Sequence, residues 1–300
     1  MSLESRRLSL NIIKNSCNFD SVNSLIIQRD LSQLDAFIKF KSAVLIYIFS
    51  SLFIKDEDNF LEEISENYYL YPNITPNGSL APKSEFDSEY NGLVSSYIDL
   101  LRSIELDKFI LKHHFPFHIR IKKYGQKTHK STRPHATELI HSDAWAGESS
   151  NAVNFHIPLF GDVKNNHMNF FMPPPTFQTD WLRHLNDYAE GESIANLYSP
   201  VSFTYEQDTG IISDLSTLHK TFITEHSGIR ISFDTTFLNL KDPSHNEIEF
   251  IHPNRLNEML NFEFFSTLGK TNLIRFSNSI YTPIQDSQSF SVGYDWVATA

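Results

Sequence analysis

The chain has 300 residues and a mass of 34.7 kDa, enough for one large domain or two ordinary ones with a full hydrophobic core. Hydrophobic residues make up 40% and charged residues 20%, a globular composition that excludes a disordered or fibrous protein. With 25 basic and 36 acidic residues the formal net charge is −11, which argues against general nucleic-acid binding. The single cysteine, Cys17, excludes an intramolecular disulfide and a zinc site built from several cysteines.

No pattern in the sequence indicates a membrane partner. The start of the chain lacks the apolar region of a secretory signal, and the longest apolar run, residues 43–54, is shorter than the ~20 residues of a bilayer span. We therefore expect a cytoplasmic protein without a membrane partner. No pattern predicts its oligomeric state.

The first part of the chain, residues 1–108, is expected to be a helical extension that packs on the core. Apolar residues recur at helical spacing from Asp35 onward and again over residues 88–110. Between them, residues 71–83 are rich in Pro, Asn and Gly and are expected to form a loop.

The middle part, residues 109–240, is expected to form a β-rich core. Apolar and polar residues alternate over residues 117–122 and 151–160, as in half-buried strands. Further strands are predicted at residues 167–172, 201–205, 210–213 and 229–238, with a short helix over residues 180–190. Short strands between turns, together with 25 phenylalanines, predict a mainly β fold with flanking helices, either a sandwich or a barrel.

The last part, residues 241–300, is expected to be a C-terminal helical extension. Apolar residues return to helical spacing over residues 255–265. From residue 281 onward the sequence has the composition of a loop.

A His-x-Asp sequence, His141 and Asp143, lies within the β-rich part. If it lies on a strand, its imidazole and carboxylate project from one face and could bind one metal ion. His219, which follows a predicted strand, is the best candidate for a third ligand. Two histidines and one carboxylate leave coordination positions open and are typical of non-haem Fe(II) oxygenases. The alternative is a surface turn, since about one such tripeptide is expected by chance.

A candidate carboxylate-binding pair follows on the next predicted strand. Arg230 stands 230 − 219 = 11 residues after His219 and shares one face of the strand with Ser232. A guanidinium fork and a hydroxyl suit a terminal carboxylate.

The order His-x-Asp, His, Arg-x-Ser resembles the pattern of the Fe(II)/2-oxoglutarate-dependent oxygenase superfamily, over roughly residues 118–237. The resemblance implies a double-stranded β-helix, a jelly roll of cupin type. It implies that Fe(II) binds to His141, Asp143 and His219, and that Arg230 and Ser232 hold the distal carboxylate of the co-substrate 2-oxoglutarate. With O2 as oxidant, the implied products are succinate, CO2 and an oxidised substrate.

Within the superfamily, the segments at residues 141–145 and 154–159 look most like the branch that modifies small metabolites and sugars, typified by streptomycin-biosynthesis oxygenases. An aspartate at position 143 indicates hydroxylation, or a related desaturation or ring closure. Relatives that halogenate have a small residue at this position.

Residues near the motif are further candidates for the site. Tyr124 resembles a tyrosine that touches the co-substrate in relatives, and ordinary packing is the alternative. Trp145 could line a substrate pocket or belong to the core. Asn154 and His156 share one face of a predicted strand, which either points into the fold or faces solvent. Asn169, on the next strand, is a weaker substrate candidate.

The sequence therefore predicts an enzyme that hydroxylates a small polar metabolite, such as a sugar, an amino acid or a carrier- or nucleotide-linked intermediate. The segment 118–133 contains basic residues and no acidic ones, and could attract an anionic substrate. Two alternatives stay open: a metal-dependent jelly-roll enzyme that does not use 2-oxoglutarate, and a non-catalytic jelly roll that binds a sugar or another ligand.

Overall fold

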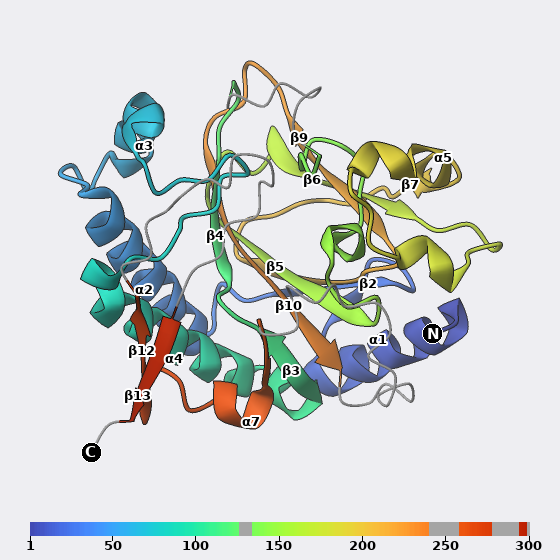
Figure 1. The fold of residues 1–300 in the computed structure, drawn as a ribbon, viewed down its shortest axis with the longest axis horizontal. Coiled ribbons are helices and arrows are strands. Elements are labelled where there is room, and N and C mark those ends of the chain that lie inside the picture. The colour runs from blue at the N-terminus through green and yellow to red at the C-terminus, as the bar shows by residue number, and fades with distance from the viewer. Residues whose placement is uncertain (126–133, 240–257, 278–293, 299–300) are drawn as a thin grey trace.

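Two antiparallel sheets form the centre of the molecule, and helices cover one face of the larger sheet (Figure 1). The structure is a computed structural model and describes residues 1–125, 134–239, 258–277 and 294–298. This mainly β architecture with flanking helices confirms the predicted double-stranded β-helix.

The main sheet has the strand order β1-β2-β8-β5-β10-β3-β11, and β4 also pairs with β10. The small sheet has the order β7-β6-β9, and β12 and β13 form a separate hairpin. The strands are β1 (Asp20–Ser21), β2 (Ile26–Asp30), β3 (Ile110–His114), β4 (His118–Lys122), β5 (Ala152–Gly161), β6 (Asn166–Met172), β7 (Ser199–Pro200), β8 (Thr209–Asp214), β9 (Leu218–Ile223), β10 (Arg230–Asn239), β11 (Met259–Asn261), β12 (Asn272–Phe276) and β13 (Tyr294–Ala298). The α-helices are α1 (Leu3–Cys17), α2 (Asp35–Leu52), α3 (Phe60–Asn67), α4 (Asp87–Ser103), α5 (Glu192–Ala195) and α7 (Phe262–Phe265).

One face of the main sheet is apolar and packs against α2 and α4. Phe155 and Ile157 of β5 are fully buried in this core. Phe233 of β10 meets Phe40 of α2 and Tyr97 of α4, with ring centroids 5.2 and 4.6 Å apart. Burying each such side chain contributes on the order of 1.5–3 kcal/mol. Because side chains alternate along a strand, the residues between them are turned to the opposite face.

That opposite face of β5 and β10 is polar and is turned toward the small sheet. Asn154 and His156 of β5 lie opposite Thr236 and Asp234 of β10 in the strand register. All four residues are buried, although their side chains are polar. Buried polar groups are stable only when they have hydrogen-bond partners or ligands. The fold therefore keeps a polar layer between its two sheets.

Several predicted elements differ in the structure. Residues 180–190 do not form one helix, because backbone N–H groups there bond outside the segment: Leu185 donates to the carbonyl of Trp145 and Tyr188 to that of Pro134. Residues 201–205 form no strand. The N-terminal part supplies β2, which pairs with β8 and was not expected from the helical pattern. The domain boundaries predicted above stay a prediction.

In the C-terminal part, the predicted helix over residues 255–265 falls partly outside the described residues. Its described portion contains β11 and the short helix α7. The predicted loop from residue 281 onward lies mostly outside them, and the described residues at its end form β13.

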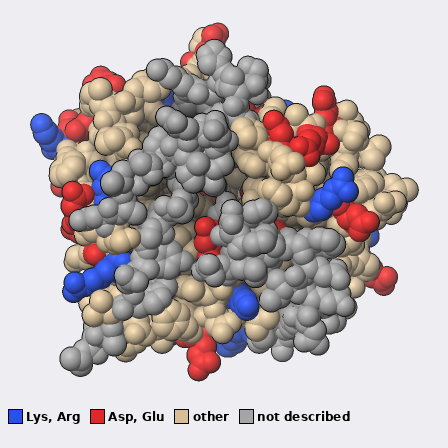
Figure 2. Space-filling view, in the orientation of Figure 1, with Lys and Arg blue, Asp and Glu red and all other residues tan. Residues whose placement is uncertain are grey.

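Charges of both signs are scattered over the coloured part of the face in Figure 2, with acidic side chains the more frequent. Among the described helices, none is both long enough and apolar enough to cross a membrane.

A buried histidine on β3, in contact with α4, makes the stability of the fold depend on pH. One ring nitrogen of His113 is 3.0 Å from the hydroxyl of Tyr97, and the other is 2.7 Å from the carbonyl oxygen of His114. The ring also stacks on Phe265. Burial lowers the pKa of His113 to about 3. An unfolded chain, with an ordinary histidine pKa near ~6.5, binds more protons than the folded chain at intermediate pH.

We expect the unfolding free energy to fall on acidification from pH ~6 to ~4, with His113 contributing about 1.4 kcal/mol per pH unit. In His113→Gln this slope should be smaller by that amount, as measured by urea unfolding at several pH values. His226→Gln is the matched control, because the His226 side chain is 88% exposed. A His113→Gln slope equal to the wild-type slope contradicts the prediction.

Candidate metal centre

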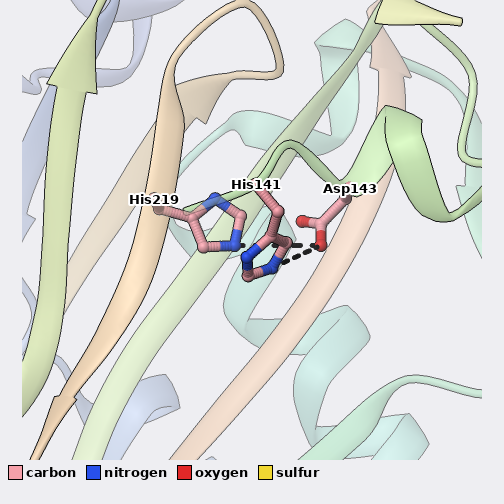
Figure 3. A group of neighbouring side chains, drawn as sticks. All are labelled: His141, Asp143 and His219. Carbon is pink, nitrogen blue, oxygen red and sulfur yellow. Dashed lines mark ion pairs between the residues drawn. The ribbon is translucent and has the colours of Figure 1, made fainter. Parts of the chain in front are cut away.

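His141, Asp143 and His219 come together in space (Figure 3), and one ligand atom from each lies within 4.8 Å of the others. His141 lies in an extended segment that pairs with β9. Its N–H donates to the carbonyl of His219 at 2.9 Å, and the N–H of His219 donates back at 2.8 Å. This bridge joins segments far apart in the sequence and places the two imidazoles side by side, with ring centroids 4.3 Å apart.

Asp143 reaches the histidines through a turn, so the expectation that the His-x-Asp pair shares a strand face is wrong. Asp143 begins a 3-10 turn, residues Asp143–Ala146. Ser142 caps this turn, since its Oγ accepts from the N–H of Ala144 at 3.2 Å and donates to the carbonyl of Leu215 at 2.7 Å. Ser142 therefore attaches the turn to the β8–β9 connection. The strand β9 follows this connection and carries His219 to the site.

Helix α1 braces the same connection from outside. Nη1 of Arg6 lies 3.0 Å from Oδ1 of Asp214, and both side chains are almost fully buried. The same Asp214 oxygen accepts from the N–H of Ser216 at 2.7 Å. A buried ion pair with extra hydrogen bonds holds a turn in one geometry. The N-terminal helix thus helps to position the segment that leads to His219.

Distances within the triad fit a shared ion better than direct bonds. Oδ1 of Asp143 is 3.9 Å from Nε2 of His141 and 3.8 Å from Nε2 of His219. These separations are too long for hydrogen bonds. They suit ligands that each coordinate one central metal at about 2 Å. In the described part of the chain, this is the group of three that could hold a metal ion.

His141 and Asp143 are in the protonation states that a metal needs. Nδ1 of His141 is 2.8 Å from the carbonyl oxygen of Leu139, so it carries the proton and Nε2 keeps its lone pair. That Nε2 is buried without a hydrogen-bond partner among the described residues. Burial lowers the pKa of His141 to about 3. Burial alone would raise the pKa of Asp143, but His219, His141 and Arg120 hold it below its usual value. Neutral imidazole and ionised carboxylate are the metal-binding forms.

Neighbouring side chains orient two of the three ligands. Nδ2 of Asn154 donates to Oδ2 of Asp143 at 2.7 Å, which leaves Oδ1 facing the histidines. The ring of Tyr188 stacks on His141 at 4.2 Å and 14°. Trp145 packs in the cluster that contains Tyr188, and its indole N–H donates to the carbonyl of Trp181.

We expect Asn154→Ala to weaken Fe(II) binding by about 10- to 100-fold, because outer partners of metal ligands have effects of that size. The measurement is competition with a coloured Fe(II) chelator under anaerobic conditions. Asn165→Ala is the control, since Asn165 bonds the separate residue Asp162. Equal affinities of the two variants would show that Asn154 does not support the site.

Arg230 and Ser232 lie on the same polar face of β10, near its start. Both are fully buried, and Nε of Arg230 and Oγ of Ser232 have no hydrogen-bond partner among the described residues. The register between β5 and β10 shifts beside them, opposite Pro158, which has no N–H to donate. These two buried donor atoms, Nε of Arg230 and Oγ of Ser232, fit a polar ligand that accepts from both, such as a carboxylate.

A chain of buried polar residues continues from Arg230. Its Nη1 donates to the hydroxyl of Tyr205 at 3.2 Å. Tyr205 is in hydrogen-bond contact with Nε2 of His156, and Nδ1 of His156 is in contact with Asp234. Asp234 also forms an ion pair with Arg120.

Sequence reasoning had not singled out three of these residues. Asp234 and Arg120 could have been found, because Asp234 shares the strand face of Arg230 and Arg120 alternates with apolar residues on β4. Tyr205 lies in an irregular segment for which the sequence predicts a strand. No sequence motif indicates that its side chain belongs to the site.

The structure places the remaining candidates differently from one another. Asn154 and His156 both point inward, and they touch Asp143 and Asp234 respectively. Trp145 is fully buried, as expected for a residue of the core.

Tyr124 lies just beyond β4 with 48% of its surface exposed. Asn169 is half-buried and alternates with Phe170, the residue opposite His219, so it is not brought to the triad. Contacts of these residues with substrate or co-substrate stay predictions.

Comparison with solved structures found chains of similar fold. The α-ketoglutarate-dependent epimerase SnoN from nogalamycin biosynthesis is 11% identical, covers 77% of this chain and 83% of its own, and has a TM-score of 0.41. The α-ketoglutarate-dependent carbocyclase SnoK from the same biosynthesis is 13% identical, with coverage of 84% and 97% and a TM-score of 0.40. An N-substituted L-amino acid dioxygenase from Burkholderia ambifaria is 11% identical, with coverage of 78% and 89% and a TM-score of 0.40.

Likenesses at this level carry no activity over to this chain. No family model and no curated protein matches the sequence.

Proposed function

We propose that the chain is a non-haem Fe(II)/2-oxoglutarate-dependent oxygenase that hydroxylates a small polar metabolite. The observation that carries the proposal is the buried Nε2 of His141, which faces Asp143 and His219 and has no hydrogen-bond partner in the part of the chain that the structure describes. Arg230 and Ser232 add a carboxylate-binding pair on the inward face of the main sheet, since each has a buried polar atom that no described residue contacts through a hydrogen bond. An ion and a dicarboxylate together would satisfy these groups.

His141, Asp143 and His219 would hold Fe(II). When bound, the iron and 2-oxoglutarate supply the activation of O2. The residues of the chain do the remaining work. Asn154 orients the Asp143 carboxylate, and Arg230 and Ser232 bind and orient the distal carboxylate of 2-oxoglutarate. The fully buried Ser232 and Arg230 also keep water from that end of the site.

Asp143 itself bears on the type of reaction. This chain resembles a superfamily in which the halogenating members bind a halide at the position of this carboxylate. Hydroxylation, or desaturation or ring closure by the same oxidant, is therefore the proposed outcome. The structures of similar fold include an α-ketoglutarate-dependent epimerase and an α-ketoglutarate-dependent carbocyclase.

The substrate is proposed as a small molecule, and an anionic character stays a prediction. Part of the basic segment 118–133 lies outside the described residues. Of the rest, Arg120 pairs with Asp234, and Lys122 lies 2.6 Å from Oγ1 of Thr137 and 3.9 Å from Glu138. These two cations have partners within the fold, so they add little attraction for an anion.

Anaerobic absorption spectroscopy tests the proposal. Wild-type protein mixed with Fe(II) and 2-oxoglutarate should show the weak visible charge-transfer band of the chelate, and admitting O2 with a suitable substrate should convert 2-oxoglutarate to succinate. Fe(II) binding without the band supports the metal enzyme that does not use 2-oxoglutarate. No Fe(II) binding at all supports the non-catalytic ligand-binding jelly roll, and either result overturns the proposal.

A further inference from the structure

A row of hydrogen bonds links Arg230 to Asp234 through two side chains that the proposed function does not use. The order is Arg230, Tyr205, His156, Asp234, and each of the four is more than nine-tenths buried. The row crosses between strands: Arg230 and Asp234 are on β10, His156 is on β5, and Tyr205 comes from the segment between β7 and β8.

The direction of each hydrogen bond in the row is fixed by chemistry. An ionised Asp234 only accepts, so Nδ1 of His156 carries the proton and Nε2 accepts from the Tyr205 hydroxyl. The Tyr205 oxygen is then free to accept from Nη1 of Arg230, which only donates. Burial lowers the pKa of His156, which favours this neutral form. Burial alone would raise the pKa of Asp234, but His156, Arg120 and Arg230 lower it below its usual value, so Asp234 is ionised.

The row restrains Arg230 and leaves part of its guanidinium available. Besides the hydrogen bond, the guanidinium carbon lies 5.7 Å from the centre of the Tyr205 ring. Within residues 1–125, 134–239, 258–277 and 294–298, no group forms a hydrogen bond with Nε of Arg230 or with Oγ of Ser232, two residues along the same face. A long, flexible side chain loses entropy when it is fixed, so fixing it before the ligand arrives strengthens ligand binding.

We propose that Tyr205 is a positioning residue for the co-substrate: held by His156 and Asp234, its hydroxyl holds the Arg230 guanidinium in the orientation that receives the distal carboxylate of 2-oxoglutarate. The inference rests on the proposed function. Tyr205 acts through Arg230, so it strengthens binding only of a 2-oxo acid that carries a second carboxylate. A tyrosine that merely stabilised the fold would affect every 2-oxo acid alike.

The test compares two 2-oxo acids on the full chain loaded anaerobically with Fe(II). One probe is 2-oxoglutarate, and the other is 2-oxopentanoate, in which a methyl group replaces the distal carboxylate. Both chelate iron through the same keto acid, and the charge-transfer band gives both dissociation constants. In Tyr205→Phe we expect 2-oxoglutarate to bind about tenfold more weakly, the equivalent of one hydrogen bond to a charged group, and 2-oxopentanoate to bind as in wild type.

Tyr47→Phe is the control, because Tyr47 is a fully buried tyrosine in the helical layer. It should change neither constant. His156→Asn provides a second variant: its amide can replace Nδ1 at Asp234, but nothing replaces Nε2 at Tyr205. It should show the same selective loss in smaller measure, and it serves as the test if Tyr205→Phe does not fold.

The outcomes separate the two proposals. If wild type shows no band with either acid, the proposed function fails and the inference with it. If wild type shows the band and prefers 2-oxoglutarate, but the two variants weaken both acids equally or neither, the proposed function stands and the role of Tyr205 is overturned.

Discussion

Replacing Asp143 with Asn is expected to lower the affinity for Fe(II) by more than about 100-fold, beyond the 10- to 100-fold typical of partners outside the ligand shell. The amide is neutral, so it attracts a divalent cation less than the carboxylate does. Its size is unchanged, and its side-chain oxygen can still accept the hydrogen bond that Asn154 donates to the Asp143 carboxylate. The variant should therefore fold normally. Titration with Fe(II) in the presence of a competing chelator measures the loss, and thermal unfolding without metal checks the fold.

The control for Asp143→Asn is Asp99→Asn on α4, where the side chain is 53% exposed and pairs with surface lysine and arginine. It should bind Fe(II) as wild type does. If Asp143→Asn also kept wild-type affinity, Asp143 would not be a ligand and the two-histidine, one-carboxylate assignment would be wrong.

Replacing Arg230 with Lys is expected to weaken 2-oxoglutarate binding by about 100-fold and to leave Fe(II) affinity unchanged. Lysine keeps the charge but cannot present two parallel donors to a carboxylate. Each hydrogen bond to a charged group contributes about 1.5–3 kcal/mol, and about 2.7 kcal/mol corresponds to 100-fold. The lysine would also leave the Tyr205 hydroxyl without its donor. Band intensity against 2-oxoglutarate concentration gives the dissociation constant.

Arg102→Lys is the matched control, because the Arg102 side chain is 45% exposed on α4. Parallel losses of Fe(II) and 2-oxoglutarate binding in Arg230→Lys would indicate a damaged fold rather than a lost anchor. An unchanged 2-oxoglutarate constant would remove Arg230 from the site.

The group His141, Asp143 and His219 could be predicted from the sequence because it is recognised by the types of its residues and by their order along the chain. The two-residue spacing of His141 and Asp143 was interpreted as a strand, yet the group forms because Ser142 caps a turn on the β8–β9 connection. That hydrogen bond joins Ser142 to Leu215, 73 residues further along the chain, so no local sequence pattern contains both partners.

The strands β5 and β10 could be predicted for a different reason. Apolar residues alternate with polar ones along both, so the sequence also told which side chains share a face. The sequence did not show whether the face that carries the polar side chains points into the fold or toward solvent. Asn154 and His156 are buried because helices cover the apolar face of the main sheet and the small sheet covers the other.

Tyr205 shows where sequence reasoning stops. Its segment has the composition of a strand but makes few ladder hydrogen bonds, since β6 pairs with β9 on one side and only with the short β7 on the other. The position of Tyr205 is set by tertiary contacts, in the cluster with Met168, Phe170 and Ile211. Such contacts depend on how side chains pack between the two sheets, and they produce no hydrophobic periodicity in the sequence.

The central claim is that one ferrous ion is held by His141, Asp143 and His219. The most direct measurement is an anomalous difference map at the iron edge, from crystals grown anaerobically with Fe(II) and 2-oxoglutarate. The account predicts a single strong peak within bonding distance of both Nε2 atoms and the Asp143 carboxylate, with 2-oxoglutarate density extending from it to Arg230 and Ser232. A peak bound elsewhere, or Arg230 directed away from that density, would contradict it.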